Sequence, residues 1–312
     1  MTRTHPQTEP AGDFAEALER YEQRRAAEMA DPDLDDGCAS TLLHHGAATE
    51  RALVLFHGYT NCPQQLSGIA ELAYSAGLNV YSPLAPEHGR TDRDPSRLEH
   101  VTELDLERFV TEAVALASGL AEHVAVLGFS FGGVCASWAA RHLDEVSEAL
   151  ILSPSFAPRA TPLWAVPFLP VWSRMLPERQ LWWDPVRKEG YLGAPYSYRR
   201  FSRRGIGTVF ALGQDVTRGK ARRSTRLQRA VLVLNATDVA ISPTAAWQAF
   251  QGGVVPIAED VELYRFKATD RFPHDLIDPN GMSGSRAPDV WPVLLSLLGV
   301  QTDGIERHAN DM

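Results

Sequence analysis

A serine between two glycines is the first feature of this sequence that could do chemistry. Residues Gly128-Phe129-Ser130-Phe131-Gly132 follow the apolar run Val124-Ala125-Val126-Leu127 and precede a helical pattern. A serine at a sharp strand-to-helix turn exposes its hydroxyl, and small neighbours are needed there to clear the backbone. The N-terminus of the following helix would favour developing negative charge. We therefore interpret Ser130 as a nucleophile, the alternative being a serine that only caps the helix.

A serine nucleophile needs a general base, and three histidines follow Ser130 in the chain: His142, His274 and His308. His142 lies three turns along the helix that begins after Ser130, so its side chain is expected to point away. His308 lies in the polar C-terminal tail. His274 follows a strand-like run and is the candidate base.

The base in turn needs an acceptor that orients its ring, and Asp238 is the candidate acid. It follows the strand-like run 230–235, and His274 follows the run 261–266. Both lie on loops at the carboxyl ends of strands, where open α/β sheets build their sites. Asp260 and Asp270 are rival acids nearby. The order Ser130, Asp238, His274 is typical of one large class of serine hydrolases.

A carbonyl oxygen that becomes an oxyanion needs two N–H donors. The loop His57-Gly58-Tyr59-Thr60 follows the first strong strand pattern, where one donor is expected. We predict that the backbone N–H groups of Tyr59 and Phe131 form this oxyanion hole. His57 comes too early in the chain to be the base, and we interpret it as a structural residue.

The elements that must position these residues alternate between strands and helices, which predicts a mostly parallel sheet flanked by helices, an α/β fold. The expected strands are Ala52–Phe56, Leu78–Ser82, Val124–Gly128, Ala149–Ser153, Ala230–Asn235 and Val261–Phe266. The expected helices are Pro63–Ala76, Leu104–Leu120, Phe131–His142, Pro243–Phe250 and Val290–Leu298.

The alternation breaks between residues 154 and 228, a length far beyond an ordinary connection, which predicts an inserted cap subdomain. Its aromatic residues suggest an apolar substrate site, with packing of the cap against the main domain as the alternative. The candidate substrate-binding residues are Trp164, Phe168, Trp172, Trp182 and Trp183. The second half, from Arg199 to Arg229, has ten Lys or Arg and one acid. Such a run is most often a solvated face, but it could also steer anionic substrates.

The N-terminal region, residues 1–50, is expected to form a peripheral helix over 12–30 and a linker with the acidic stretch Asp31–Asp36. Residues 1–36 carry ten acids and four bases, so pairing of this segment with the basic stretch 199–229 is a further alternative to a solvated face. The core would then consist of residues 51–153 and 229–312.

The composition excludes some classes of function. The 312 residues carry a formal net charge of −9, which argues against nucleic acid as a partner. No apolar run is long enough for a membrane helix, and the N-terminus lacks the apolar core of a signal peptide. Three cysteines in a chain of this length suggest reduced thiols, and the expected location is cytoplasmic.

From about Arg51 to Val300 the chain resembles the α/β-hydrolase superfamily, and within it esterases and monoacylglycerol-lipase-like carboxylesterases. The segments that carry the resemblance are His57-Gly58-Tyr59-Thr60-Asn61, Pro86-Glu87-His88-Gly89, Gly128–Gly133, Asp238-Val239-Ala240-Ile241 and Pro273-His274. One departure is Glu87, which stands where relatives commonly have a glycine before the histidine. The loop at Tyr59 also differs from the His-Gly-Gly-Gly type of some esterases.

The resemblance implies a triad of Ser130, Asp238 and His274, an oxyanion hole from Tyr59 and Phe131, and a cap over the pocket. The expected reaction is hydrolysis of small carboxylic esters, for which the aromatic residues of the cap suggest an apolar acyl or aromatic group. No cofactor and no metal is expected. The same triad could serve a carbon–carbon bond hydrolase, a thioesterase or an amidase. A ligand receptor that keeps the fold without turnover is the alternative from a different class.

Overall fold

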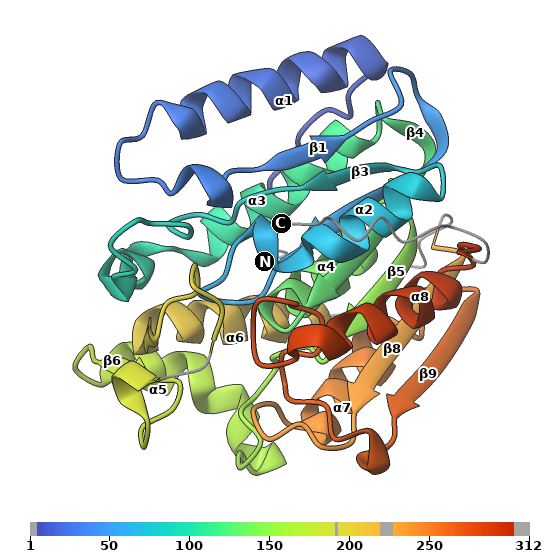
Figure 1. Ribbon diagram of the computed structural model, residues 1–312. Coiled ribbons are helices and arrows are strands. Elements are labelled where there is room, and N and C mark those ends of the chain that lie inside the picture. The colour runs from blue at the N-terminus through green and yellow to red at the C-terminus, as the bar shows by residue number, and fades with distance from the viewer. Residues whose placement is uncertain (1–4, 191–192, 219–226, 303–312) are drawn as a thin grey trace.

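The computed structural model describes residues 5–190, 193–218 and 227–302, and its centre is a seven-stranded sheet (Figure 1). The strand order is β1-β3-β2-β4-β5-β8-β9. All neighbouring pairs are parallel except β1 with β3. The strands are β1 (Thr41–Leu43), β2 (Thr49–Phe56), β3 (Asn79–Ser82), β4 (Ala121–Phe129), β5 (Val146–Leu152), β8 (Arg229–Asn235) and β9 (Asp260–Phe266). The predicted fold class is confirmed.

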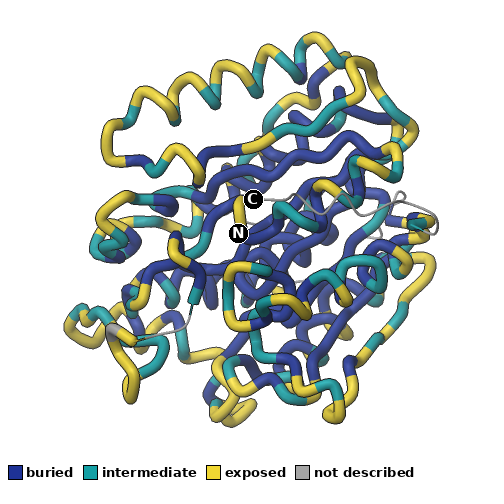
Figure 2. Tube along the Cα trace, in the orientation of Figure 1, coloured by how far each residue is buried: buried dark blue, intermediate teal, exposed yellow. Residues whose placement is uncertain are grey.

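Helices cover both faces of this sheet because successive side chains of a central strand point to opposite sides. Val54 and Leu55 of β2 are both fully buried, and they belong to two separate hydrophobic clusters. One cluster includes helices α3 (Glu103–Ala117), α4 (Phe131–His142), α6 (Arg203–Thr217) and α7 (Pro243–Gly253), and the other includes α2 (Ser67–Ser75) and α8 (Ala287–Leu297). Figure 2 shows the resulting buried sheet between partly exposed helices.

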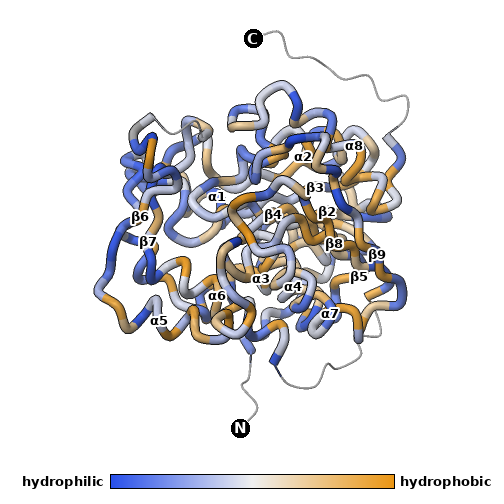
Figure 3. Tube along the Cα trace, turned by 90° about the horizontal axis from the view of Figure 1, so that it is seen from below, coloured by the Kyte–Doolittle hydropathy of each residue, from blue (hydrophilic) through white to orange (hydrophobic). Residues whose placement is uncertain are grey.

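Between β5 and β8 the chain forms an insertion, residues 153–228, at the place where the sequence predicts one over 154–228. It contains α5 (Leu169–Met175), the antiparallel strands β6 (Gln180–Trp182) and β7 (Arg200–Ser202), and α6. Residues 191–192 and 219–226 of this range lie outside the described residues. Hydrophobic residues gather in the central strands, and hydrophilic ones lie toward the outside (Figure 3).

The N-terminal region contains the predicted helix, α1 (Phe14–Met29), and also the edge strand β1, which lies in the predicted linker. The acidic stretch is ordered by arginines of a nearby loop, in the pairs Asp31 with Arg90, Asp33 with Arg97 and Asp35 with Arg93. Within the described part of the chain, no ion pair joins it to the basic stretch 199–229. Residues 219–226 of the basic stretch lie outside the described residues, so its pairing with the N-terminal segment stays a hypothesis.

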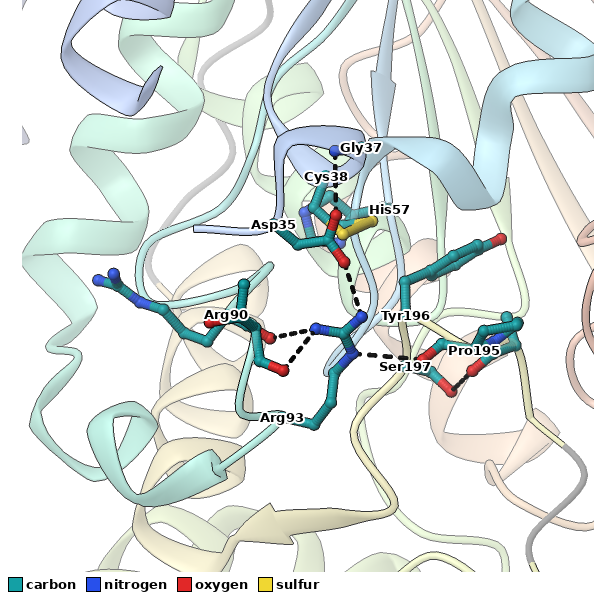
Figure 4. The surroundings of a disulfide bond; sticks show 12 residues. Asp35, Gly37, Cys38, His57, Arg90, Arg93, Pro195, Tyr196 and Ser197 are labelled. Atoms are coloured by element: carbon teal, nitrogen blue, oxygen red, sulfur yellow. Dashed lines mark hydrogen bonds and ion pairs between the residues drawn. A yellow bond between two sulfur atoms is a disulfide. The ribbon is translucent and has the colours of Figure 1, made fainter. Parts of the chain in front are cut away.

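The cysteines correct the expectation of reduced thiols. Cys38 and Cys62 form a disulfide with their Cα atoms 5.2 Å apart, whereas Cys135 is free and buried. Beside the disulfide, Arg93 donates hydrogen bonds to Asp35 and to the backbone oxygen of Pro195 in the insertion (Figure 4). The expected cytoplasmic location loses the support that reduced thiols gave it, since disulfides persist mainly in oxidising compartments.

Among the described residues, no helix combines the length and the apolar character needed to cross a bilayer.

Candidate active site

Ser130 lies at the sharp turn between β4 and α4. Its backbone has φ 56° and ψ −109°, a conformation that is strained for a residue with a side chain. A Cβ at Gly128 would lie 1.8 Å from the oxygen of Gly132, and a Cβ at Gly132 would lie 1.9 Å from the oxygen of Phe56. Both glycines are therefore required by close backbone contacts. The Ser130 hydroxyl makes no capping hydrogen bond, which removes the helix-cap alternative.

The structure brings Ser130, His274 and Asp238 into one line of hydrogen bonds. Nε2 of His274 is 3.0 Å from Oγ of Ser130, and Nδ1 of His274 is 2.7 Å from Oδ2 of Asp238. Because Asp238 is an acceptor, the ring proton sits on Nδ1 and leaves the lone pair of Nε2 facing the serine. Asp238 follows β8 and His274 follows β9, so both loops lie at carboxyl ends of strands, as predicted.

The carboxylate of Asp238 is held by its own loop as well as by His274. It accepts hydrogen bonds from the backbone N–H groups of Ala240 at 2.8 Å and Ile241 at 3.2 Å. Burial acts to raise the pKa of Asp238, but the His274 ring and these N–H groups outweigh it and hold the pKa below its ordinary value. Asp238 is thus ionised at neutral pH.

The rival acids are engaged elsewhere. Asp260 pairs with Arg229 at the start of β9. Asp270 accepts a hydrogen bond from the backbone N–H of Lys267 in an exposed turn. Neither contacts His274, and the third downstream histidine, His308, lies outside the described residues.

Tyr59 and Phe131, the two predicted oxyanion donors, lie next to each other. Phe131 is the first residue of α4, Tyr59 follows β2, and their ring centroids are 6.0 Å apart. The first N–H groups of a helix have no partner within the helix, so the N–H of Phe131 can bind an anion. Within the described residues, neither backbone N–H has a hydrogen-bond acceptor.

His57 has the structural role expected of it. The ring is buried, Nδ1 donates to the oxygen of Gly58 at 2.9 Å, and Nε2 accepts from the N–H of Ala85 at 3.1 Å. Burial, together with neighbouring His88, lowers the pKa of His57 to about 3. A neutral ring therefore joins the loop of Tyr59 to the loop after β3.

Sequence reasoning missed a second group that holds the Tyr59 loop. The side-chain oxygen of Gln65 accepts from the N–H of Gly58 at 2.7 Å, and its amide nitrogen donates to Asp275 at 2.8 Å. Asp275 is adjacent to His274 in sequence, but its carboxylate points to this other loop. Gln65 and Asp275 are 210 residues apart, and no local pattern in the sequence predicts their contact.

The departure at Glu87 has a conformational explanation. Glu87 has φ 59°, the left-handed region in which glycine is favoured, and its side chain forms an ion pair with Arg90. The next residue, His88, stacks on Phe131 with ring centroids 5.9 Å apart and 5° between the planes. The loop thus supports the start of α4 through His88.

The insertion exposes three of its five candidate substrate-binding aromatics. Trp164 is 71% exposed, Phe168 49% and Trp172 43%, and Phe168 stacks on Trp172. Side chains packed against the main domain would have a smaller exposed fraction than these three. These three side chains form an apolar surface on η4 (Leu163–Phe168) and α5.

The other two aromatics have contacts of their own. Trp182 lies under the guanidinium of Arg200, with Cζ 5.4 Å from the ring centroid. Trp183 donates a hydrogen bond from Nε1 to Oγ1 of Thr60 at 2.8 Å and packs edge-on against Tyr59. Trp183 therefore joins the insertion to the loop that carries the predicted oxyanion donor.

Comparisons with known proteins agree with the fold. A sequence model of the alpha/beta hydrolase family matches residues 53–288. Similar solved structures include the metagenome-derived lipolytic enzymes LipS and LipT, with 17% identity over 85% of this chain and 98% of that chain and a TM-score of 0.62. A monoacylglycerol lipase from Paleococcus ferrophilus has 18% identity over 84% and 98% of the two chains and a TM-score of 0.55.

A third similar structure is a soluble variant of monoglyceride lipase from Saccharomyces cerevisiae, with 13% identity over 84% and 91% of the chains and a TM-score of 0.54. The search of curated proteins found no match. At these identities the likeness to the solved structures concerns the fold.

Proposed function

The chain belongs to the alpha/beta hydrolase family, and we propose that it hydrolyses carboxylic esters through an acyl-enzyme on Ser130. The observation that carries this proposal is the unbroken contact from the Ser130 hydroxyl through both nitrogens of His274 to Asp238. A base held in one tautomer by a buried carboxylate is what activates a serine hydroxyl.

In the first half of the reaction, Oγ of Ser130 attacks the ester carbonyl while Nε2 of His274 takes its proton. The resulting oxyanion accepts hydrogen bonds from the N–H groups of Tyr59 and Phe131. The tetrahedral intermediate then collapses as the C–O bond to the alcohol breaks and His274 returns the proton to the leaving oxygen. Asp238 stabilises the imidazolium that forms in between.

In the second half, water attacks the acyl carbon while His274 accepts its proton. The bond from the acyl carbon to Oγ of Ser130 breaks, the proton returns to Oγ, and the carboxylic acid leaves. These steps use only side chains of the triad, two backbone N–H groups and water.

The substrate class is a small ester with an apolar acyl or aromatic group. The exposed surface of Trp164, Phe168 and Trp172 supports this, since apolar ligands bind to large aromatic side chains. The similar solved structures are of proteins named as lipolytic enzymes and monoglyceride lipases, and they also support this substrate class. Trp183, held by Thr60, would fix the insertion beside the reacting atoms.

The test is hydrolysis of a panel of p-nitrophenyl esters of increasing acyl length by the wild type and by Ser130→Ala. We expect kcat/KM of the variant to fall about 10⁴- to 10⁶-fold, because triad residues act as a unit. Ser137→Ala, in the same helix with its hydroxyl bonded to the oxygen of Gly133, is the matched control and should retain activity.

Three results would contradict parts of the proposal. Wild-type rates in Ser130→Ala would remove the acyl-enzyme, and absence of labelling by a fluorophosphonate probe would favour a ligand receptor. A strict preference for acetyl over longer esters would contradict the apolar substrate class while leaving the triad in place.

A further inference from the structure

Two histidines and two carboxylates meet at the end of α4 opposite to Ser130. His142 is the last residue of α4, Asp215 comes from α6, Glu107 comes from α3, and His5 comes from the N-terminal segment. His142 is twelve residues after Ser130, which places it about 18 Å along the helix axis. The mechanism proposed above does not use this cluster.

Two of the distances within the cluster are close to those between ligands of one metal ion. Nε2 of His142 is 3.3 Å and Nε2 of His5 is 3.6 Å from Oδ2 of Asp215, and the three atoms lie within 4.8 Å of one another. Around a tetrahedral zinc ion with bonds of about 2.0–2.1 Å, neighbouring ligand atoms are about 3.3–3.4 Å apart.

The environment of the His142 ring also fits a metal ligand. Its Nε2 is buried and has no hydrogen-bond partner among the described residues, although a carboxylate oxygen lies 3.3 Å away. A nitrogen and an oxygen that are close without an aligned hydrogen bond are expected where both lone pairs face a shared cation. A buried polar atom without a partner is otherwise costly.

The surroundings supply the outer contacts that metal ligands usually have. Nδ1 of His5 is 3.3 Å from Oε2 of Glu107, so a carboxylate can orient the ring that presents Nε2. Nε1 of Trp138 donates to Oδ2 of Asp215 at 3.0 Å. The side chains of Glu107 and Asp215 are nearly or fully buried, and their two charges would balance a divalent cation.

We propose that Nε2 of His5, Nε2 of His142 and Oδ2 of Asp215 bind a zinc ion, with water as the fourth ligand. Two imidazoles and a carboxylate in tetrahedral geometry favour zinc over the hard cations magnesium and calcium. The ion ties the N-terminal segment to α4 and α6 and stabilises the folded chain. The proposal departs from the sequence-based expectation of no metal, because residues 5, 142 and 215 share no recognisable spacing.

The test uses the full chain, stripped with a chelator and dialysed, then loaded with ZnCl2. We expect close to one zinc per chain by elemental analysis and a Tm several degrees above that of the stripped protein, since a ligand of the folded state raises its stability. Co²⁺ in place of zinc should give the intense visible absorption of tetrahedral coordination.

His142→Gln, His5→Gln and Asp215→Asn should each lose the bound zinc and the increase in Tm. His100→Gln removes an exposed histidine whose ion-pair partner is Glu99, and it should keep both. His5→Gln is the decisive variant if a change in α4 or α6 prevents folding, since His5 lies outside any helix or strand. Wild-type zinc content in the folded ligand variants, or no zinc in the loaded wild type, would overturn the site.

Discussion

The two ends of helix α4 gather the same kinds of side chain and arrange them differently. At the first end, the ring of His274 lies between Ser130 and Asp238, with aligned hydrogen bonds of 3.0 and 2.7 Å. At the last end, Nε2 of His142 is 3.3 Å from Asp215 without a hydrogen bond. The first arrangement suits proton transfer along a line, and the second suits ligands that converge on a point.

The comparison shows that residue type alone does not decide chemistry. A buried carboxylate beside a histidine would orient a base in the proposed triad and complete the set of metal ligands in the proposed zinc site. The deciding quantity is the direction of the imidazole lone pair relative to its neighbours. Substitutions that break one arrangement should therefore leave the other intact.

The largest effect that separates the two ends is expected from Asp238→Asn. An amide cannot accept the Nδ1–H of His274 in the same way and favours the wrong tautomer, so kcat should fall about 10³- to 10⁴-fold. Asp270→Asn, at the rival acid, should retain activity. Zinc content should not change in Asp238→Asn, and a loss of zinc there would show that the two ends are coupled.

A smaller effect is expected from Gln65→Leu, which tests how the loop of Tyr59 is positioned at the first end of α4. Losing the contacts to Gly58 and Asp275 loosens the Tyr59 loop, so kcat should fall about 10- to 100-fold while KM changes little. The adjacent exposed residue offers the control Gln64→Leu. An unchanged kcat in Gln65→Leu would mean that the contacts at His57 and Thr60 hold the loop without Gln65.

The smallest effect concerns Asp278, a buried carboxylate four residues after His274 that forms no ion pair with a described residue. Burial, with the nearby Asp275, raises the pKa of Asp278 to about 7, and Tyr196 donates a hydrogen bond to it at 2.7 Å. The folded state therefore binds the proton more tightly than the unfolded state. The stabilisation is full below the unfolded pKa of about 4 and is lost as pH rises through about 7.

Asp278→Asn removes this titration and keeps a partner for Tyr196. Thermal unfolding of the wild type should show Tm falling from pH 5 to pH 8 by a few degrees more than in the variant. Parallel curves for the two proteins would show that Asp278 does not titrate in this range.

Local patterns were enough to predict α4 and the meeting of three residues at its first end. The bounds Phe131–His142 of α4 match the structure, and Ser130, Asp238 and His274 meet although 144 residues separate the first from the last. The reason is geometric, since parallel strands bring their carboxyl ends to one edge and place their following loops together.

Contacts that depend on no such rule were not predictable. The strand β1 has three residues, and an apolar run this short does not predict a strand. The Cys38–Cys62 pair, the Gln65–Asp275 contact and the cluster at His142 join segments whose proximity follows only from the completed fold. The positive φ of Glu87 is likewise invisible, because the sequence shows a side chain where glycine is usual.

Trp183 ties the insertion to the loop of Tyr59. Its hydrogen bond to Thr60, with the backbone hydrogen bond from Tyr198 to the same residue, fastens the insertion to the residue that follows Tyr59. One threonine is thus the common anchor of two separate segments of the insertion, and a substitution at Thr60 would act on both of them.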